Sequence, residues 1–97
     1  MKTIRFSVAG DNNLADINEI LSAQGALNSE FLDSKIAYQD QKVVNLVTFN
    51  LYDDATVPKE LILRKKGENP PQNVTKFWEG IMVAGGNLIV AVAYRAK

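Results

Sequence analysis

Two groups of charged side chains are the strongest candidates for chemistry in this sequence of 97 residues. In the first group, Asp53 and Asp54 are adjacent carboxylates, and Mg²⁺ and Ca²⁺ bind to oxygen ligands of this kind. Their spacing matches no known cation-binding loop, and consecutive aspartates after a strand more commonly form a turn by bonding to the local backbone. We therefore predict a turn at these residues, with no metal site and no cofactor.

The second group is basic, and it could bind the anionic group of a metabolite, a nucleotide or a nucleic acid. Three consecutive basic residues precede a proline-containing loop at residues 67–72, and a further arginine lies near the C-terminus. The single tryptophan follows the loop and is the largest apolar side chain of the region. We predict six ligand- or partner-binding residues: Arg64, Lys65, Lys66, Asn69, Trp78 and Arg95.

Both parts of this prediction have an ordinary structural alternative. Basic residues at the end of a strand are commonly just solvated, and Trp78 in so small a domain is more commonly a core residue than a binding hot spot. The aromatic and glycine patterns of RNA-binding sheets are also missing, and eleven basic residues balance eleven acidic ones. We therefore rank nucleic acid below a protein or a small molecule as the partner.

Cysteine and histidine are both absent from the sequence. This excludes disulfides, zinc–thiolate sites, iron–sulfur clusters and thiol nucleophiles, and it removes the base of every Ser-His or Cys-His arrangement. Only carboxylates, lysines and tyrosines remain for acid–base work, and none is in a recognisable arrangement. We expect a protein that is not an enzyme, and the absence of cysteine favours a reducing, cytoplasmic location.

The composition indicates one folded domain, spanning residues 1–97. Hydrophobic residues make up 46% of the chain and charged residues 23%, which is typical of globular proteins. The first residues alternate polar with apolar, unlike a signal peptide, and no apolar run approaches the length of a membrane span. We expect neither export nor a membrane partner.

The first third of the sequence predicts a strand followed by a helix. Residues 2–9 alternate polar and apolar, and the helix is expected at about 11–24, after the capping residues 11–13 and before Gly25. Its apolar stripe contains Leu14, Ile17, Ile20, Leu21 and Gln24, and its water-facing side contains Asp16, Asn18, Glu19 and Ser22. Residues 26–34 fit no period, and we expect a loop there.

The middle of the sequence predicts a hairpin and a further short strand. Residues 35–38 and 43–52 form the two arms, with residues 39–42 as their connection. Residues 60–66 follow as a strand, and the loop at 67–72 contains two prolines, which cannot donate to a strand ladder.

The last third has two interpretations. Apolar residues within 73–84 match a helical template, although Gly80 would lie inside that helix. Alternatively, residues 74–84 and 87–95 form a hairpin, because Gly85-Gly86 tolerates the positive φ angles of a two-residue turn. We favour the hairpin, which gives an α+β fold of mainly antiparallel sheet with one N-terminal helix. The helical alternative gives an element order similar to ferredoxin-like α+β topology.

The predicted strands at 43–52 and 88–94 are apolar on both faces, and one helix can cover only one side of a sheet. A second layer or another subunit must cover the other side, so we expect a homo-oligomer. Three functions follow as hypotheses. The first is a small interaction protein that self-assembles or docks on a protein partner through strand edges and the loop at 67–72. The second is a binding or sequestering protein for an anionic metabolite or nucleotide, and the third is a nucleic-acid-binding accessory protein.

Overall fold

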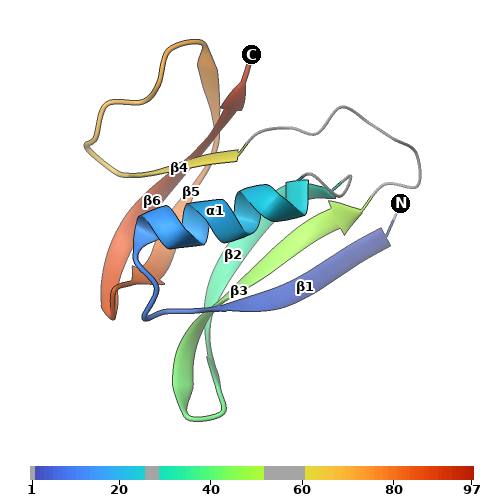
Figure 1. Ribbon diagram of the computed structural model, residues 1–97, viewed down its shortest axis with the longest axis vertical. Helices are drawn as coiled ribbons and strands as arrows, with labels where there is room; N and C mark the ends of the chain where they lie inside the picture. The colour runs from blue at the N-terminus through green and yellow to red at the C-terminus, as the bar shows by residue number, and fades with distance from the viewer. Residues whose placement is uncertain (1, 26–28, 52–60) are drawn as a thin grey trace.

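Two three-stranded antiparallel sheets and one helix make up the described part of the computed structural model, which covers residues 2–25, 29–51 and 61–97 (Figure 1). The first sheet has the order β1-β3-β2 and the second has the order β4-β6-β5. This arrangement confirms the predicted α+β class with mainly antiparallel sheet. The elements are β1 (Lys2–Ala9), α1 (Leu14–Gly25), β2 (Ser29–Gln39), β3 (Lys42–Leu51), β4 (Leu61–Lys65), β5 (Val74–Ala84) and β6 (Asn87–Ala96).

The alternative prediction of a second helix at 73–84, with a ferredoxin-like topology, is wrong. Strand β5 occupies this segment and pairs with β6. Gly85 and Gly86 join the two strands with φ values of 58° and 77°, as a two-residue hairpin turn requires. The helical spacing of the apolar residues arises from a bulge between Lys76 and Trp78. The bulge adds Phe77 to the strand, so that Phe77 and Trp78 both pack against the core although they are adjacent.

Residues 29–34, which we expected in a loop, form the first half of β2. A second bulge, between Phe31 and Asp33, explains why this segment fits no period, because Leu32 is the extra residue. The β2–β3 hairpin is confirmed, but its connection is tighter than expected. Asp40 and Gln41 alone form the turn, with φ values of 50° and 64°.

Helix α1 begins where the capping residues predicted it. The side-chain oxygen of Asn13 accepts a hydrogen bond from the backbone N–H of Asp16 at 2.8 Å, which is the geometry of an N-cap. Ile17 and Leu21, on the side of the helix that faces the core, are fully buried. In the described part of the chain, no helix is long and apolar enough to cross a membrane.

Asn18 and Ser22 do not face water as predicted, because both bind the edge of strand β4. The Asn18 Oδ1 atom accepts a hydrogen bond from the backbone N–H of Leu63 at 2.6 Å. The Ser22 hydroxyl donates to the carbonyl oxygen of Leu61 at 2.9 Å. Residues one helical turn apart thus bind alternate residues of an edge strand, and the helix protects that edge from pairing with another chain.

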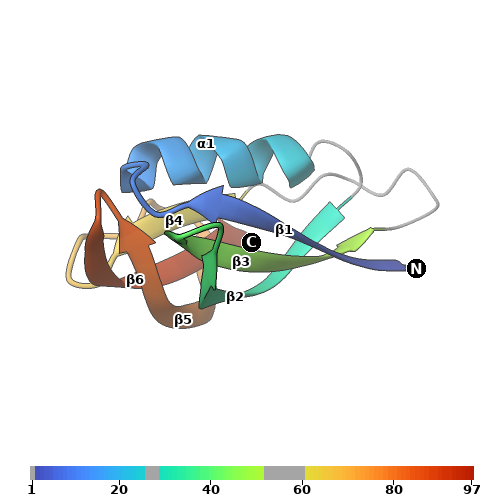
Figure 2. The ribbon, with the colours of Figure 1, turned by 90° about the horizontal axis from the view of Figure 1, so that it is seen from below.

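The two sheets meet beneath α1, which lies along one side of both (Figure 2). Phe31 on β2 is at the centre of this junction, with its ring against Phe49, Phe77 and Trp78. A polar contact adds to this apolar junction. The buried amide of Asn45 on β3 donates to the Val83 carbonyl oxygen and accepts from the Val83 N–H, both at 2.8 Å.

The connection between β1 and α1 lies against the turns of both hairpins. The Gly10 N–H donates to the Val43 carbonyl oxygen at 3.0 Å, and the Gly86 N–H donates to the Gly10 carbonyl oxygen at 2.9 Å. The Gly85 N–H donates to the carbonyl oxygen of Asn12 at 2.7 Å. Three backbone hydrogen bonds therefore fix the two hairpins relative to each other.

We expect Gly10→Ala to lower the free energy of unfolding by about 1–3 kcal/mol, the usual cost of overpacking. A Cβ atom at Gly10 would lie 2.6 Å from Val83 Cγ1 and 2.9 Å from the Val43 carbonyl oxygen. Urea denaturation of Gly10→Ala, Val83→Ala and the double variant tests this reason. The double variant should lose less stability than the sum of the two single variants, because Val83→Ala removes the methyl group that obstructs the new Cβ. Additive losses would contradict the steric explanation.

Candidate functional site

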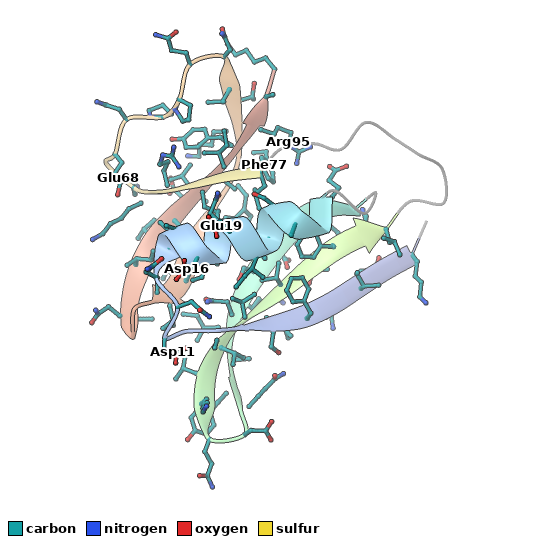
Figure 3. All side chains as sticks on the ribbon, viewed as in Figure 1. Asp11, Asp16, Glu19, Glu68, Phe77 and Arg95 are labelled. Carbon is teal, nitrogen blue, oxygen red and sulfur yellow. The ribbon has the colours of Figure 1, made fainter. Side chains whose placement is uncertain are left out.

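The six predicted site residues do not share one surface. Arg95 is partly buried and makes two contacts within the molecule, and Figure 3 labels it beside one of its partners, Phe77. Its Nη1 atom lies 2.9 Å from the carboxylate of Glu30, and its guanidinium carbon lies 3.7 Å above the ring centroid of Phe77. The Arg95 and Glu30 side chains are only 23% and 21% exposed. Arg95 therefore joins β6 to β2 and β5, and its charge is already neutralised by an acid.

Trp78 is a partly buried residue that packs against the core. Its ring contacts Phe31 edge to face, with 5.3 Å between the ring centroids. The indole also lies over Gly80, where an added Cβ would be 2.4 Å from the ring. Gly80 thus leaves the space that the tryptophan occupies, which explains a glycine in the middle of a strand.

The other four predicted residues belong to the end of β4 and the loop that follows. Lys65 and Asn69 are exposed, whereas Arg64 donates to the neighbouring carbonyl oxygen of Leu63 at 3.1 Å. Because successive side chains of a strand point to opposite faces of the sheet, Arg64 and Lys65 cannot both contact a ligand bound on one face. The binding role of the six residues remains a prediction, and none of the contacts described above joins two of them.

Lys66 faces an acid on the neighbouring hairpin. Its Nζ atom lies 3.4 Å from one carboxylate oxygen of Glu79, and the Nζ atom of Lys76 lies 3.0 Å from the other. The hydrogen bond from Lys76 lowers the pKa of the Glu79 carboxyl, and the charge of Lys66 lowers this pKa further. This surface trio contains two cations and one anion, which reduces the attraction of Lys66 for a phosphate.

A different surface has the features of a binding site. Eight large apolar side chains are exposed among the described residues: Ile20 on α1, and seven on the two hairpins that meet at Gly10. One of the seven, Leu32, is the extra residue of the β2 bulge, and the other six are considered together. We call these six the hairpin patch: Ile36, Tyr38 and Val43 from β2–β3, and Ile81, Leu88 and Val90 from β5–β6. Tyr38 and Leu88 are the most exposed, at 70% and 71%.

The strand registers place these side chains beside one another. Tyr38 is directly opposite Val43, and Ile81 is directly opposite Val90. Directly opposite residues of an antiparallel pair point to the same face, so each hairpin presents a cross-strand apolar pair to solvent. The buried Asn45–Val83 hydrogen bonds hold the two hairpins together.

A groove of about 420 Å³ lies between the two hairpins. Its lining comes from the β1–α1 connection and from both hairpins: Ala9, Gly10, Asp11, Lys42, Val43, Val83, Gly86 and Leu88. Asp11 and Lys42 are its two charged residues, both are exposed, and neither has an ion-pair partner among the described residues. The groove therefore combines an apolar lining with one charge of each sign, which suits an apolar side chain from another molecule.

The described residues contain no group of three carboxylates that could hold a metal ion. Asp53 and Asp54, where the sequence predicts a turn, lie outside the described residues. Within the groove, Asp11 is the only acidic and Lys42 the only basic lining residue.

The sequence prediction missed the hairpin patch, although the signal for it was present. Strand β6 was predicted to be apolar on both faces, and the structure shows that one of these faces is left uncovered at Leu88 and Val90. The expectation that something else must cover this face was therefore the useful signal. The concentration of positive charge, by contrast, favoured residues 64–66 as the binding site.

No family model, curated protein or solved structure matches this chain.

Proposed function

We propose that this protein acts by binding another protein chain through the hairpin patch, without catalysing a reaction. The observation that carries the proposal is the presence of six exposed apolar side chains on two adjoining hairpins, two of which, Val43 and Leu88, line the groove between them. Single exposed apolar residues are common on protein surfaces, but a contiguous patch with a polar rim is typical of an interaction site. Burial of such a patch against a partner removes apolar area from water, which favours association.

Hydrogen bonds within the molecule also fix the two hairpins that form the hairpin patch, so the patch can bind without first becoming ordered. Three backbone hydrogen bonds join the β1–α1 connection to the two hairpins, and Asn45 adds two more between β3 and β5. A surface that is fixed in advance loses little conformational entropy on binding. This support favours a rigid docking platform over a segment that folds on its partner.

Strand edges and the loop of residues 67–72 are the docking sites predicted from the sequence, but the contacts in the structure favour the hairpin faces. Asn18 and Ser22 bind the edge of β4, and Asn45 binds the edge of β5 at Val83. Backbone groups that already have partners gain little by adding a strand from another protein. We therefore place the partner on the apolar faces.

The two other hypotheses have weaker support. Of the four basic residues predicted to bind an anion, Arg95 binds Glu30, Lys66 lies beside Glu79, and Arg64 and Lys65 point to opposite faces of β4. For nucleic acid, the same contacts reduce the number of cations available to phosphates. A cytoplasmic location remains part of the proposal, because a cysteine-free chain needs no oxidising compartment.

Site-specific photo-crosslinking in the cells that naturally express the protein tests the proposal. A photoreactive phenylalanine analogue at Leu88 should give a discrete crosslinked protein product, because this side chain belongs to the hairpin patch, is 71% exposed and lines the groove. The matched control is Leu32, an apolar residue that is 39% exposed but lies on the bulge of β2. We expect no discrete product from position 32. Equal products from both positions, or none from position 88, would contradict the proposal.

A further inference from the structure

We infer that the partner on the hairpin patch is a second copy of this chain, in a two-fold symmetric dimer. This inference rests on the proposed function and adds the identity of the bound chain. In such a dimer both copies use the same surface. If residue i of one copy contacts residue j of the other, then residue j of the first copy also contacts residue i of the second. A surface suited to this use must be complementary to itself in charge and in shape.

The charges of the groove meet the first requirement. Asp11 and Lys42 line the same groove, belong to different elements and have no ion-pair partner among the described residues. A rim with charges of only one sign would repel its own copy, whereas a rim with both signs can pair Asp11 of each copy with Lys42 of the other. The whole chain has eleven charges of each sign, so no net repulsion opposes the approach of two copies.

The shape of the hairpin patch meets the second requirement. Tyr38 and Leu88 protrude, with 70% and 71% of their surface exposed, and the groove of about 420 Å³ lies beside them. Tyr38 is directly opposite Val43, a residue of the groove lining. A projecting side chain and a recess therefore occur side by side on one surface, and a two-fold axis between them lets Tyr38 of each copy enter the groove of the other.

The size of the surface sets the expected strength of the dimer. A standard stable interface uses roughly 20–30 residues on each side. The hairpin patch and the groove lining together provide about half of that number. We therefore expect a reversible dimer that dissociates on dilution, rather than an obligate one.

Analytical ultracentrifugation of the full chain over a dilution series, from about 500 to 5 μM, is the test. We expect the wild type to move from dimer to monomer across the series. Leu88→Glu should weaken the dimer by more than about tenfold, because it places a carboxylate against apolar groups in the interface. Leu32→Glu, on an exposed bulge outside the hairpin patch, is the matched control and should dimerise as the wild type does.

A charge-reversal cycle tests the symmetric pairing directly. Asp11→Lys and Lys42→Asp should each weaken the dimer by about tenfold, because each places like charges opposite one another. The double variant restores opposite charges across the axis and should recover most of the affinity. Thermal unfolding of each variant verifies that the fold is intact, and added salt should reduce the differences between the variants.

The possible results separate this inference from the proposed function. A wild type that is monomeric at every concentration would overturn the second-copy inference. In that case a crosslink from position 88 to a different protein would leave the proposed function standing, and no crosslink would overturn both. A dimer that persists in Leu88→Glu, or a double charge reversal as weak as the single ones, would overturn the two-fold arrangement through the hairpin patch.

Discussion

Replacing Asn45 with alanine is expected to lower the free energy of unfolding by about 3 kcal/mol, which corresponds to a fall in melting temperature of roughly 15 °C for a domain of this size. The Asn45 side chain is fully buried, and its amide makes two hydrogen bonds of 2.8 Å with the backbone of Val83, which is 5% exposed. The alanine variant leaves the Val83 N–H and carbonyl groups without these partners in the interior. Each buried polar group that loses its partner costs about 1–3 kcal/mol.

Two further variants separate the hydrogen bonds from the volume of the side chain. Asn45→Leu restores apolar bulk but no hydrogen bonds, so it should remain well below the wild type in stability. Asn50→Ala is the matched control, because Asn50 lies on the same strand and makes one exposed hydrogen bond with Thr3. We expect it to change stability by less than about 1 kcal/mol. Urea denaturation gives the stabilities, and a leucine variant as stable as the wild type would contradict this account.

Amide hydrogen exchange adds a local reading of the same contact. The Val83 N–H donates to Asn45 in the wild type, so its exchange should be slow. In Asn45→Ala, the Val83 N–H should exchange faster than the global loss of stability explains. Unchanged relative protection would show that a different group satisfies this N–H.

The elements that could be predicted from the sequence are those specified by local chemistry. The alternation of residues 2–9 predicts β1, and Asn13 caps α1 as expected. Gly85-Gly86 adopts the positive φ angles that its turn requires. In each case the deciding energy is a backbone preference or a neighbouring hydrogen bond, so a short segment contains the whole signal.

The bulges at Leu32 and Phe77 could not be predicted in this way. Each adds one residue to a strand and shifts the alternation of its side chains, so the sequence pattern fits a loop in one case and a helix in the other. The cause of each bulge is tertiary. Both place an aromatic ring, Phe31 or Phe77, at the junction of the two sheets.

The polar residues that bind strand edges were predicted incorrectly for a related reason. Asn18 and Ser22 lie on the polar side of a helix, and the pattern alone cannot distinguish a hydrogen bond to a strand edge from contact with water. Asn45 lies among apolar residues of β3 without a local partner, because its partner is 38 residues further along the chain. Such contacts become visible only when the two sheets are placed together.

The candidate site was only partly predictable. Five of the six predicted residues were selected by charge or ring size, but Arg95 and Trp78 are partly buried and use these properties in contacts within the molecule. The sequence did predict that the strand at 88–94 would leave an apolar face in need of a cover. Which residues remain exposed there depends on the position of α1 over the other side of both sheets, and that is a property of the whole fold.

The junction of the sheets leads to the second large prediction, which concerns Phe31. We expect Phe31→Ala to lower the free energy of unfolding by about 3–5 kcal/mol, the range observed when a buried phenylalanine is truncated. Phe31 is 4% exposed, and its ring centroid lies 5.9 Å from that of Phe49, 5.8 Å from that of Phe77 and 5.3 Å from that of Trp78. The alanine variant removes all three edge contacts and leaves a cavity between the sheets.

The neighbouring residue provides a matched control for this prediction. Leu32→Ala truncates an apolar side chain that is 39% exposed at the bulge, and we expect it to cost less than about 1 kcal/mol. The chain has a single tryptophan, and Trp78 contacts Phe31, so its fluorescence reports the state of the junction during urea denaturation. Similar losses from Phe31→Ala and Leu32→Ala would show that the junction contributes little.

The cooperativity of unfolding shows whether Phe31 also couples the two sheets. Phe31 belongs to the β1-β3-β2 sheet, whereas Phe77 and Trp78 belong to the β4-β6-β5 sheet, so its ring is a direct contact between them. Because Asn45 and the Gly10 hydrogen bonds still join the sheets in the variant, we expect one transition at lower urea concentration, with coincident fluorescence and circular dichroism curves. Separate transitions by the two probes would instead mean that the Phe31 ring is what makes both sheets unfold together.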